Sequence, residues 1–475
     1  MRWNRHSTAA VELGFFLAVA WALYGPHLGG PYFLDSVSSV ARDPDITQDL
    51  WTYLTECKKS FYLYRPVNRL TFWLDHRLPG HPRAFNICLL GLSGFALGEL
   101  IRRAYGRMPT FWALLWMCHP LLVQGTQYVC QRPVLLCALF SFMALDAHLR
   151  GSRWFWPWCA LAMGSKEIGA MVPLAAIMLP PRPFRKQAIP AGHMLVVIGV
   201  VLLGISVIVP PEVASGKGFT VAERLLMQPE AFRTYLTAVI FPVPSALSLE
   251  RPLSFPGVDP WGVLLIVCVL FLTLRVKERW LWVSWMGFLP EAGPFALEPI
   301  FDHRAILPMA WLTVVSSRRL HLGVSLLTPL LVACTILTST WLWYWDDDRR
   351  LYEHGAEVSD SWRAWYNLGA AYTDRATAST VPAEWPVYSG RALGPLRRSV
   401  GLRREHGSTW VNLGASLWRV GEYDEGVHWM TQAARLSPGA KGNLERMMRE
   451  AVFERLPLSE ETAVAAIEVL MEGKR

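Results

Sequence analysis

Charged residues are scarce in this sequence, and their scarcity excludes an ordinary water-soluble protein. They make up 18% of the 475 residues, whereas soluble domains carry about 25%. Hydrophobic residues reach 52%, and tryptophan alone occurs 23 times. Almost all long apolar runs precede Asp346, after which the sequence turns charged with a helical periodicity. We therefore predict an all-α protein with a polytopic membrane domain over residues 1–345 and a soluble domain over residues 346–475.

The sequence also lacks the patterns typical of metal-binding and nucleic-acid-binding proteins. Its 8 cysteines form no CxxC pair, and most lie within apolar runs as small hydrophobic residues. Cys57 and Cys130 fall in loops expected outside the cytoplasm, so a disulfide between them stays open. The net charge of +8 comes from short basic clusters between apolar runs, which is typical of membrane-flanking loops. We predict neither a metal site nor a nucleic-acid partner from these patterns.

Eleven apolar runs are the main feature that is present. Several are shorter than the roughly 20 residues that a perpendicular span needs, so their flanks enter the membrane or their helices are broken. The first run follows basic residues and has no clear A-x-A cleavage site, so we interpret it as an uncleaved span. The runs lie near residues 8–25, 85–101, 108–123, 133–149, 154–163, 168–179, 194–210, 261–274, 280–289, 305–317 and 322–345.

Six basic clusters between the runs determine the predicted topology. If all six are cytoplasmic, eleven spans alternate strictly across the membrane. This arrangement requires residues 211–258 to stay outside, with the helical piece 221–241 lying in the interface or re-entering. The alternative is a twelfth span at 221–241, which moves the last two clusters to the outer side. The clusters are Arg2/Arg5, Arg102/Arg103/Arg107, Arg150/Arg153, Arg182/Arg185/Lys186, Arg275/Lys277/Arg279 and Arg318/Arg319.

The C-terminal domain contains two related segments. Both have the pattern W-x-x-L-G, at Trp365 and at Trp410, and the second continues with the small residues and the proline of a tetratricopeptide repeat of about 34 residues. The two tryptophans lie 45 residues apart because the first copy has an insertion around "TASTVPAEWPVYSG". Residues 441–471 are expected to supply a third helical pair. Such a domain predicts a bound peptide or protein partner and nothing more specific.

With eleven spans, the C-terminal domain and almost every unusual polar residue lie outside the cytoplasm. We expect a bacterial inner-membrane protein with its C-terminal domain in the periplasm. Asp35 lies where the first span ends, and it is either a helix-end acid or a general base beside the membrane. Lys166 and Glu167 join two short apolar runs in "GSKE", where they either form a structural ion pair or belong to a functional site.

Basic residues also begin two of the predicted spans on that face. Arg132 in "CQRPVL" and Arg304 in "FDHRAILP" present planar guanidinium groups that suit a lipid phosphate. Either of them could instead extend to lipid headgroups. The segment "YRPVNRLTFWLDH", which begins at residue 64 and includes Arg65, is expected to be an amphipathic helix on the bilayer surface.

Taken in order, several of these stretches resemble the GT-C membrane glycosyltransferases. Within that superfamily they are similar to the O-mannosyltransferase-like proteins that contain tetratricopeptide repeats, and to their bacterial relatives. The resemblance covers most of the chain, and the order of the motifs is more specific than any single motif. The matching stretches are "YFLDSVSSVARDPDI", "YRPVNRLTFWLD", "NICLL", "HPLLVQGTQYVCQRPVLLCALF", "GSKEIGAMVP", "FPVPSALSLERPLS", "FDHRAILP" and the C-terminal repeats.

The resemblance implies an enzyme that moves a sugar from a polyprenyl-phosphate carrier to an acceptor hydroxyl, such as that of a protein Ser or Thr, on the outer face. The lipid-linked donor is then the co-substrate, and the repeats bind a protein acceptor or partner. The residues expected to act are Asp35 as general base, Arg132, Lys166 and Arg304 as ligands of the donor phosphate, and Glu167, His303 and Arg65 as supporting groups.

The sequence departs from that family at three places. The family usually has paired acids after the first span, and here the second position is Ser36. Gln131 replaces the glycine before Arg132, and a histidine that precedes Asn86 in the family is replaced. The loss of the second acid leaves a requirement for a divalent metal open. It also favours a rival hypothesis, a non-catalytic membrane scaffold whose repeats recruit a partner outside the cytoplasm. A transporter is disfavoured because the hydropathy shows no inverted repeat.

Overall fold

Every regular element in the described part of this chain is a helix, which confirms the all-α prediction. The computed structural model describes residues 5–34, 36, 40, 43–55, 65–179, 220–249, 257–292, 300–404 and 406–472. The chain forms two compact units. One comprises Met1–Leu247 and Leu253–Asp346, and the other comprises Ser248–Pro252 and Asp347–Arg475.

Four helices of the first unit are long and apolar enough to cross a membrane, among the residues that the structure describes. They extend over Thr8–His27, Pro82–Arg103, Val129–Leu149 and Val324–Trp345. These ranges contain α1 (Arg5–Tyr24, in its greater part), α4 (Pro82–Arg103), α7 (Arg132–Leu149) and α17 (Val324–Trp345). The chain therefore has the apolar helices of a membrane protein.

The other predicted runs form shorter helices. The run near 108–123 is broken, because Pro120 lacks the N–H that would continue the helix. The run near 194–210 lies outside the described residues, so eleven spans and the twelve-span alternative both stay predictions. The shorter helices are α2 (Leu50–Thr55), α3 (Pro66–Arg77), α5 (Pro109–Met117), α6 (Leu122–Gln127), α8 (Phe155–Ser165), α9 (Met171–Met178), α12 (Val221–Leu226), α13 (Gln228–Ile240), α14 (Pro260–Val276), α15 (Arg279–Ala292) and α16 (Ile306–Arg319).

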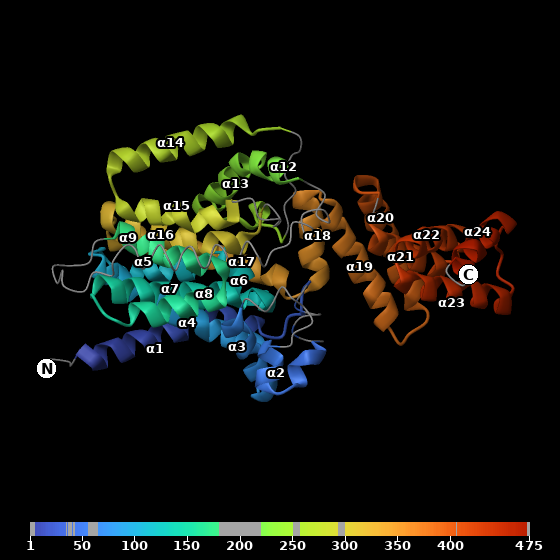
Figure 1. The fold of residues 1–475 in the computed structure, drawn as a ribbon, viewed down its shortest axis with the longest axis horizontal. Helices are drawn as coiled ribbons and strands as arrows, with labels where there is room; N and C mark the ends of the chain where they lie inside the picture. Colours follow the sequence, from blue (N-terminus) through green and yellow to red (C-terminus); the bar gives the residue numbers. More distant parts are fainter. Residues whose placement is uncertain are drawn as a thin grey trace. The chain divides into compact units, whose positions relative to one another are not determined.

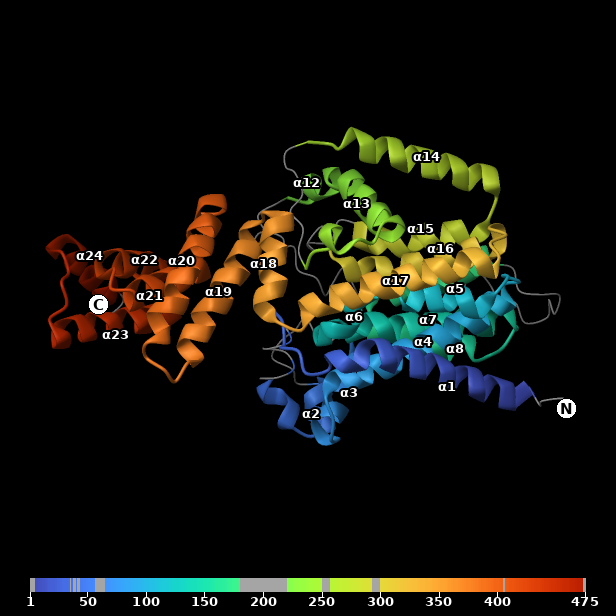
Figure 2. The ribbon, with the colours of Figure 1, turned by 180° about the vertical axis from the view of Figure 1, so that it is seen from behind.

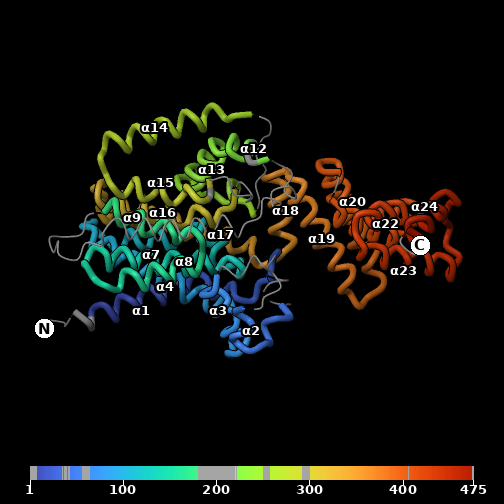
Figure 3. Tube along the Cα trace, viewed as in Figure 1, coloured from blue at the N-terminus to red at the C-terminus, as the bar shows by residue number. Residues whose placement is uncertain are grey.

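Helices α1, α4, α7 and α8 pack side by side in that order, and α15 packs against α16 (Figure 1). Short 3₁₀ turns join them where the chain changes direction: η1 (Gly25–His27), η3 (Pro44–Thr47), η5 (Val129–Gln131), η6 (Glu167–Ala170), η8 (Pro244–Ala246) and η9 (Asp302–Ala305). Helix α14 lies at the margin of the unit and packs against α13 (Figure 3). Its apolar side chains Leu264, Val267 and Phe271 are more than half exposed. An apolar surface of this kind is stable in contact with lipid rather than water.

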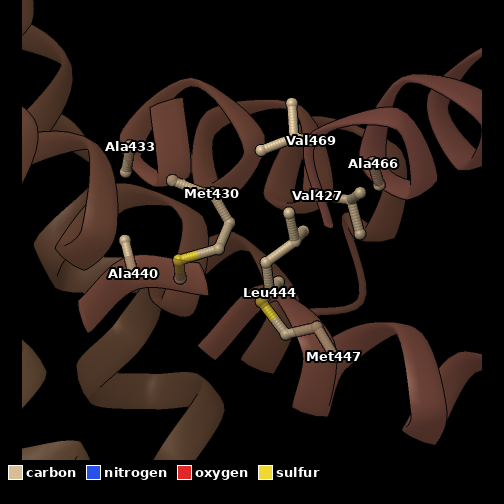
Figure 4. Close-up of a cluster of buried hydrophobic side chains, with 9 residues drawn as sticks. Val427, Met430, Ala433, Ala440, Leu444, Met447, Ala466 and Val469 are labelled. Carbon is tan, nitrogen blue, oxygen red and sulfur yellow. The ribbon is translucent and has the colours of Figure 1, made fainter. Parts of the chain in front are cut away.

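The second unit is a row of antiparallel helices in which each helix packs against the next (Figure 2). Its core brings together Val427, Met430, Leu444 and Val469 from three helices (Figure 4). The helices are α18 (Asp348–Ser359), α19 (Trp362–Ala378), α20 (Glu384–Leu402), α21 (Gly407–Arg419), α22 (Tyr423–Leu436), α23 (Pro438–Glu454) and α24 (Glu460–Met471).

The two W-x-x-L-G segments begin equivalent helical hairpins. Trp365 is the fourth residue of α19, and Trp410 is the fourth residue of α21. Helix α19 has 17 residues where α21 has 13, and α20 has 19 where α22 has 14. Most of the insertion predicted near "TASTVPAEWPVYSG" is therefore found within α19 and α20. Each of these helices is longer than its counterpart by about one turn, since a turn takes about 3.6 residues. The hairpin pattern is as expected, and the tetratricopeptide class itself stays a prediction.

Glycine is required where α21 meets α22. A methyl group on Gly414 would lie 2.8 Å from the Gly426 carbonyl oxygen and 3.1 Å from the Met430 backbone nitrogen. Because these are backbone atoms, they cannot rotate away. We expect Gly414→Ala to lower the free energy of unfolding by about 1–3 kcal/mol, as overpacked cores do. Gly390→Ala in α20, where no atom lies within 4 Å, is the control and should be neutral or stabilising by about 0.5–1 kcal/mol. Denaturant unfolding followed by tryptophan fluorescence measures both, and equal effects would refute the argument.

His406 makes the second unit sensitive to acid. Its ring lies 4.7 Å from the ring of Trp362 and 4.9 Å from that of Tyr366, between centroids. Burial, with the nearby charges of Arg403 and Arg363, lowers the pKa of His406 to about 4. The unfolded chain takes up this proton near pH 6.5, so the stability is complete above about pH 6.5 and decreases as the pH falls toward 4.

We therefore expect the unfolding midpoint of the second unit to fall between pH 7 and pH 5. His406→Asn keeps a good residue at the start of α21 and removes the titrating ring, so its midpoint should change less over the same range. An NMR titration of His406 in the folded protein should have its midpoint near pH 4. A midpoint near 6.5 would contradict this prediction.

Candidate functional site

The chain that leads from α1 to Asp35 is fixed by a buried arginine of α4, although Asp35 itself lies outside the described residues. Arg83 has no exposed surface. Its guanidinium donates hydrogen bonds to the carbonyl oxygens of Leu28, Gly30, Pro31 and Gln127. At the end of η1, His27 Nδ1 lies 2.8 Å from a carboxylate oxygen of Asp346. These contacts tie the start of the first outer loop to α4 and to the residue after α17.

Ser36 lies where the resembled family has its second acid, and here its side chain is buried and hydrogen-bonded. The residue is fully buried. Its hydroxyl oxygen accepts a hydrogen bond of 3.1 Å from the backbone N–H of Cys130. The residue next to Asp35 is therefore held against η5, two positions before Arg132. Cys57 lies outside the described residues, so its predicted disulfide with Cys130 stays untested.

The "GSKE" segment forms the sharp turn that the sequence predicts between two helices. Helix α8 ends at Ser165, Lys166 is extended, and Glu167 begins η6. Gly169 makes the turn feasible, because a methyl group there would lie 2.4 Å from the backbone of Ala162. Lys166 is buried, with 6% of its surface exposed.

Glu167 pairs with Arg65 at the start of α3. Arg65 Nε and Nη2 donate to the two carboxylate oxygens of Glu167 at 2.8 and 2.9 Å. Such a bidentate pair fixes both side chains in direction as well as in distance. Two of the supporting residues expected from the sequence therefore contact each other, across 102 positions of the chain.

His303 lies among the cations of the candidate site. Gln124 Oε1 accepts hydrogen bonds from the His303 backbone N–H at 2.7 Å and from ring Nδ1 at 2.9 Å, so Nδ1 carries the proton and Nε2 keeps its lone pair. Burial and the charges of Lys166, Arg304 and Arg65 hold the pKa of His303 well below its usual range. The ring is therefore neutral, and three of the predicted cations act on it.

Helix α15 explains why these turns meet. It contacts both η6, which follows Lys166, and η9, which contains His303 and Arg304. Helix α3 packs against α8 and brings Arg65 to the same place. Asp302, His303 and Arg304 are each at most 5% exposed. The cluster thus holds three cations (Arg65, Lys166 and Arg304) and two carboxylates (Glu167 and Asp302), which leaves a positive excess.

Arg132 is engaged by protein acceptors. It is completely buried and forms an ion pair with Asp75. Its Nε donates to Asn86 Oδ1 at 2.7 Å, Nη1 to Thr71 Oγ1 at 3.2 Å, and Nη2 to the Pro82 carbonyl at 2.9 Å. The guanidinium also lies 4.5 Å from the centre of the Phe72 ring. This network joins α3, α4 and α7 at their ends.

Helix α3 buries several polar side chains, and its predicted position on the bilayer surface stays a prediction. Asn68, Arg69 and Thr71 are at most 7% exposed, whereas Leu74 and Leu78 are exposed. Arg69 stacks on the ring of Tyr53, 4.1 Å from its centre. Its Nε and Nη2 have no hydrogen-bond acceptor among the described residues. A buried charge with unsatisfied donors is costly, so the two nitrogens that lack an acceptor in the described residues are suited to an anion.

The sequence reasoning missed Arg83, Asp75 and Gln124, which organise the site. Asp75 and Arg83 flank the start of the second predicted span, and Gln124 directly follows the apolar run near 108–123. Polar residues inside or beside apolar runs are functional candidates by default, and that rule would have found them. No group of three or more His, Cys, Asp or Glu side chains gathers as metal ligands in the described ranges.

The fold and the site define a helical membrane protein with a buried, positively charged cluster where several short turns meet. This chain is similar to the curated Protein O-mannosyl-transferase F38B6.6 of Caenorhabditis elegans, with 26% identity over 197 residues. The match covers 36% of this chain and 29% of the nematode protein. No protein-family profile and no solved structure matches the chain. The similarity is distant and indicates a relationship to glycosyltransferases.

Proposed function

We propose that this protein is a membrane glycosyltransferase that transfers a sugar from a polyprenyl phosphate to an acceptor hydroxyl outside the cytoplasm, with a protein Ser or Thr as acceptor. The observation that supports it most is the convergence of α3, η6 and η9, which brings Arg65, Lys166 and Arg304 into one buried cluster. A buried cationic cluster in a membrane protein suits the phosphate of a lipid. The distant similarity to an O-mannosyltransferase supports the same class.

In the proposed reaction the acceptor oxygen attacks the anomeric carbon of the sugar. The bond between that carbon and the phosphate oxygen breaks, and the phosphate keeps the electron pair. Asp35 accepts the hydroxyl proton as general base. Lys166 and Arg304 stabilise the negative charge that grows on the leaving phosphate. Glu167 holds Arg65 in place, and Gln124 holds the neutral ring of His303, whose Nε2 can accept a hydrogen bond from the substrate.

Arg132 has a supporting role in this proposal. Because its donors bind Asp75, Asn86, Thr71 and Pro82, it stabilises the loop region beside Ser36 rather than contacting the donor phosphate directly. Arg69 replaces it as a phosphate ligand, since its Nε and Nη2 have no acceptor in the described part of the chain. The set of proposed phosphate ligands is then Lys166, Arg304 and Arg69.

Donor binding tests this assignment. We expect Lys166→Gln and Arg304→Gln each to weaken binding of a polyprenyl phosphate to the purified protein about 10–100-fold, which corresponds to losing a charge-assisted hydrogen bond of about 1.5–3 kcal/mol. Arg69→Met should weaken binding similarly while the melting temperature of the free protein stays or rises, because a buried charge is removed whose Nε and Nη2 lack an acceptor among the described residues. Arg150→Gln is the control, as Arg150 pairs with Asp146 and is 46% exposed. Unchanged binding in all three variants would refute the site.

The non-catalytic scaffold stays the second candidate, and one observation favours it. Ser36, which stands where the resembled family has an acid, is buried and bonded to the Cys130 N–H, so this position cannot serve as a second catalytic group. Mass spectrometry of envelope proteins from cells with and without the gene distinguishes the two. A hexose modification that disappears with the gene and returns with the wild-type gene supports the enzyme. Identical modification patterns would favour the scaffold.

A further inference from the structure

Helix α24 has apolar residues on two opposite faces. One face packs inward, where Ala466 and Val469 lie beside Val427 and Leu444 (Figure 4). The other face carries Val464, Ile467 and Met471, which are 49%, 52% and 58% exposed. Their spacing of three and four residues aligns them in one row along the helix. We call this row the α24 seam.

The seam is only half covered by the described residues. In a row of packed helices an inner helix buries one face on either side. Helices α22 and α23 cover one side of α24, and the seam keeps about half of each side chain exposed. A shallow depression on this face is lined by Glu460, Glu461, Val464, Ala465 and Glu468. A half-exposed apolar row of this kind is typical of a site for another helix.

Every charged residue of α24 is a glutamate. Glu460 and Glu461 lie in the first turn, where the helix dipole favours acids. Glu468 lies in the last turn, and Glu472 follows the helix, where an acid is unfavourable. Glu461, Glu468 and Glu472 line one edge of the seam, all of them exposed. Lys441 of α23 donates to the Glu472 carbonyl at 2.8 Å, and the exposed glutamate side chains leave a negative edge along the seam.

We propose that the α24 seam binds an amphipathic helix of a partner protein, with apolar residues facing Val464, Ile467 and Met471 and with Lys or Arg facing the glutamates. Charge complementarity excludes the other occupants. A second copy packed antiparallel about a two-fold axis would bring glutamates opposite glutamates, and an anionic bilayer would be repelled. The inference is independent of the proposed transferase activity.

The test uses the full-length protein in lipid nanodiscs and two synthetic helical peptides. Both have leucines at spacings of three and four residues, and their flanking positions are lysines in one and glutamates in the other. We expect the lysine peptide to bind at least ten times more tightly, by fluorescence anisotropy. Ile467→Asp should weaken this binding at least tenfold. Glu461→Lys with Glu468→Lys should reverse the preference toward the glutamate peptide.

A matched control keeps the result interpretable. Glu445→Lys makes the same Glu-to-Lys charge reversal on α23, at a side chain that is 49% exposed. It should leave the affinities for both peptides unchanged. The double charge reversal affects exposed residues only, so it tests the proposal even if Ile467→Asp misfolds. Equal binding of the two peptides, a preference that charge reversal leaves unchanged, concentration-dependent self-association through α24, or binding to anionic vesicles that Ile467→Asp abolishes would each overturn the proposal.

Discussion

Asp35→Asn should lower the rate of sugar transfer about 10²–10⁴-fold, the usual contribution of a general base. Asparagine has nearly the same shape and cannot accept the proton of the acceptor hydroxyl. The residues that fix the neighbouring chain, Arg83 and Ser36, are unchanged, so the protein should still fold and bind the donor. The rate is measured with purified protein, a polyprenyl-phosphate sugar and a Ser/Thr-containing acceptor peptide.

Asp43→Asn is the matched control for this experiment. Asp43 lies eight positions further along the same loop region, where its side chain accepts a hydrogen bond from the Asp45 N–H and caps η3. Asparagine caps such a turn equally well, so the control should retain full activity. If Asp35→Asn transfers sugar at the wild-type rate, the assigned general base is wrong. If the wild-type protein binds the donor but transfers no sugar to any acceptor, the result supports the scaffold hypothesis.

Asp75→Ala should lower the free energy of unfolding of the first unit by about 3–5 kcal/mol, as expected when one member of a buried ion pair is removed. Arg132 has no exposed surface, and the Asp75 side chain is 13% exposed. Without the carboxylate, the guanidinium keeps its neutral acceptors Asn86, Thr71 and Pro82 but loses its only carboxylate partner among the described residues. Denaturant titration of the full chain in lipid or detergent provides the measurement.

Two further variants separate charge from packing. The double substitution Arg132→Met with Asp75→Leu removes both charges, and it should recover most of the loss because apolar side chains of similar size tolerate burial. Glu445→Ala removes a surface ion pair with Arg449 and should change stability by less than about 1 kcal/mol. A loss below about 1 kcal/mol for Asp75→Ala would show that Arg132 is not stabilised by this carboxylate.

The sequence predicted local features of the site better than its long-range contacts. The turn at Lys166 and Glu167 follows from a polar tetrapeptide with a glycine between two apolar runs, and it forms where expected. The pairing of Glu167 with Arg65 and of Arg132 with Asp75 joins residues far apart in the chain. Periodicity indicates which residues share a face of one helix, and it contains no information about which faces meet.

Helix α3 shows what composition alone leaves open. Its mixture of arginines and aromatic residues has the composition of a surface helix. In the structure Asn68, Arg69 and Thr71 face inward, where the Tyr53 ring lies against Arg69 and Arg132 donates to the Thr71 hydroxyl. In the second unit the hairpins were predictable because the tryptophan and glycine that define each pattern lie within a single helical hairpin.

The burial of Ser36 has a consequence for any attempt to give the first loop a second acid. Ser36→Asp would place a carboxylate in a site with no exposed surface, where the described neighbouring donor is the backbone N–H of Cys130. A charge in such a site is costly unless further donors reach it. Installing a pair of acids in this loop therefore requires compensating changes in η5 together with the substitution at position 36.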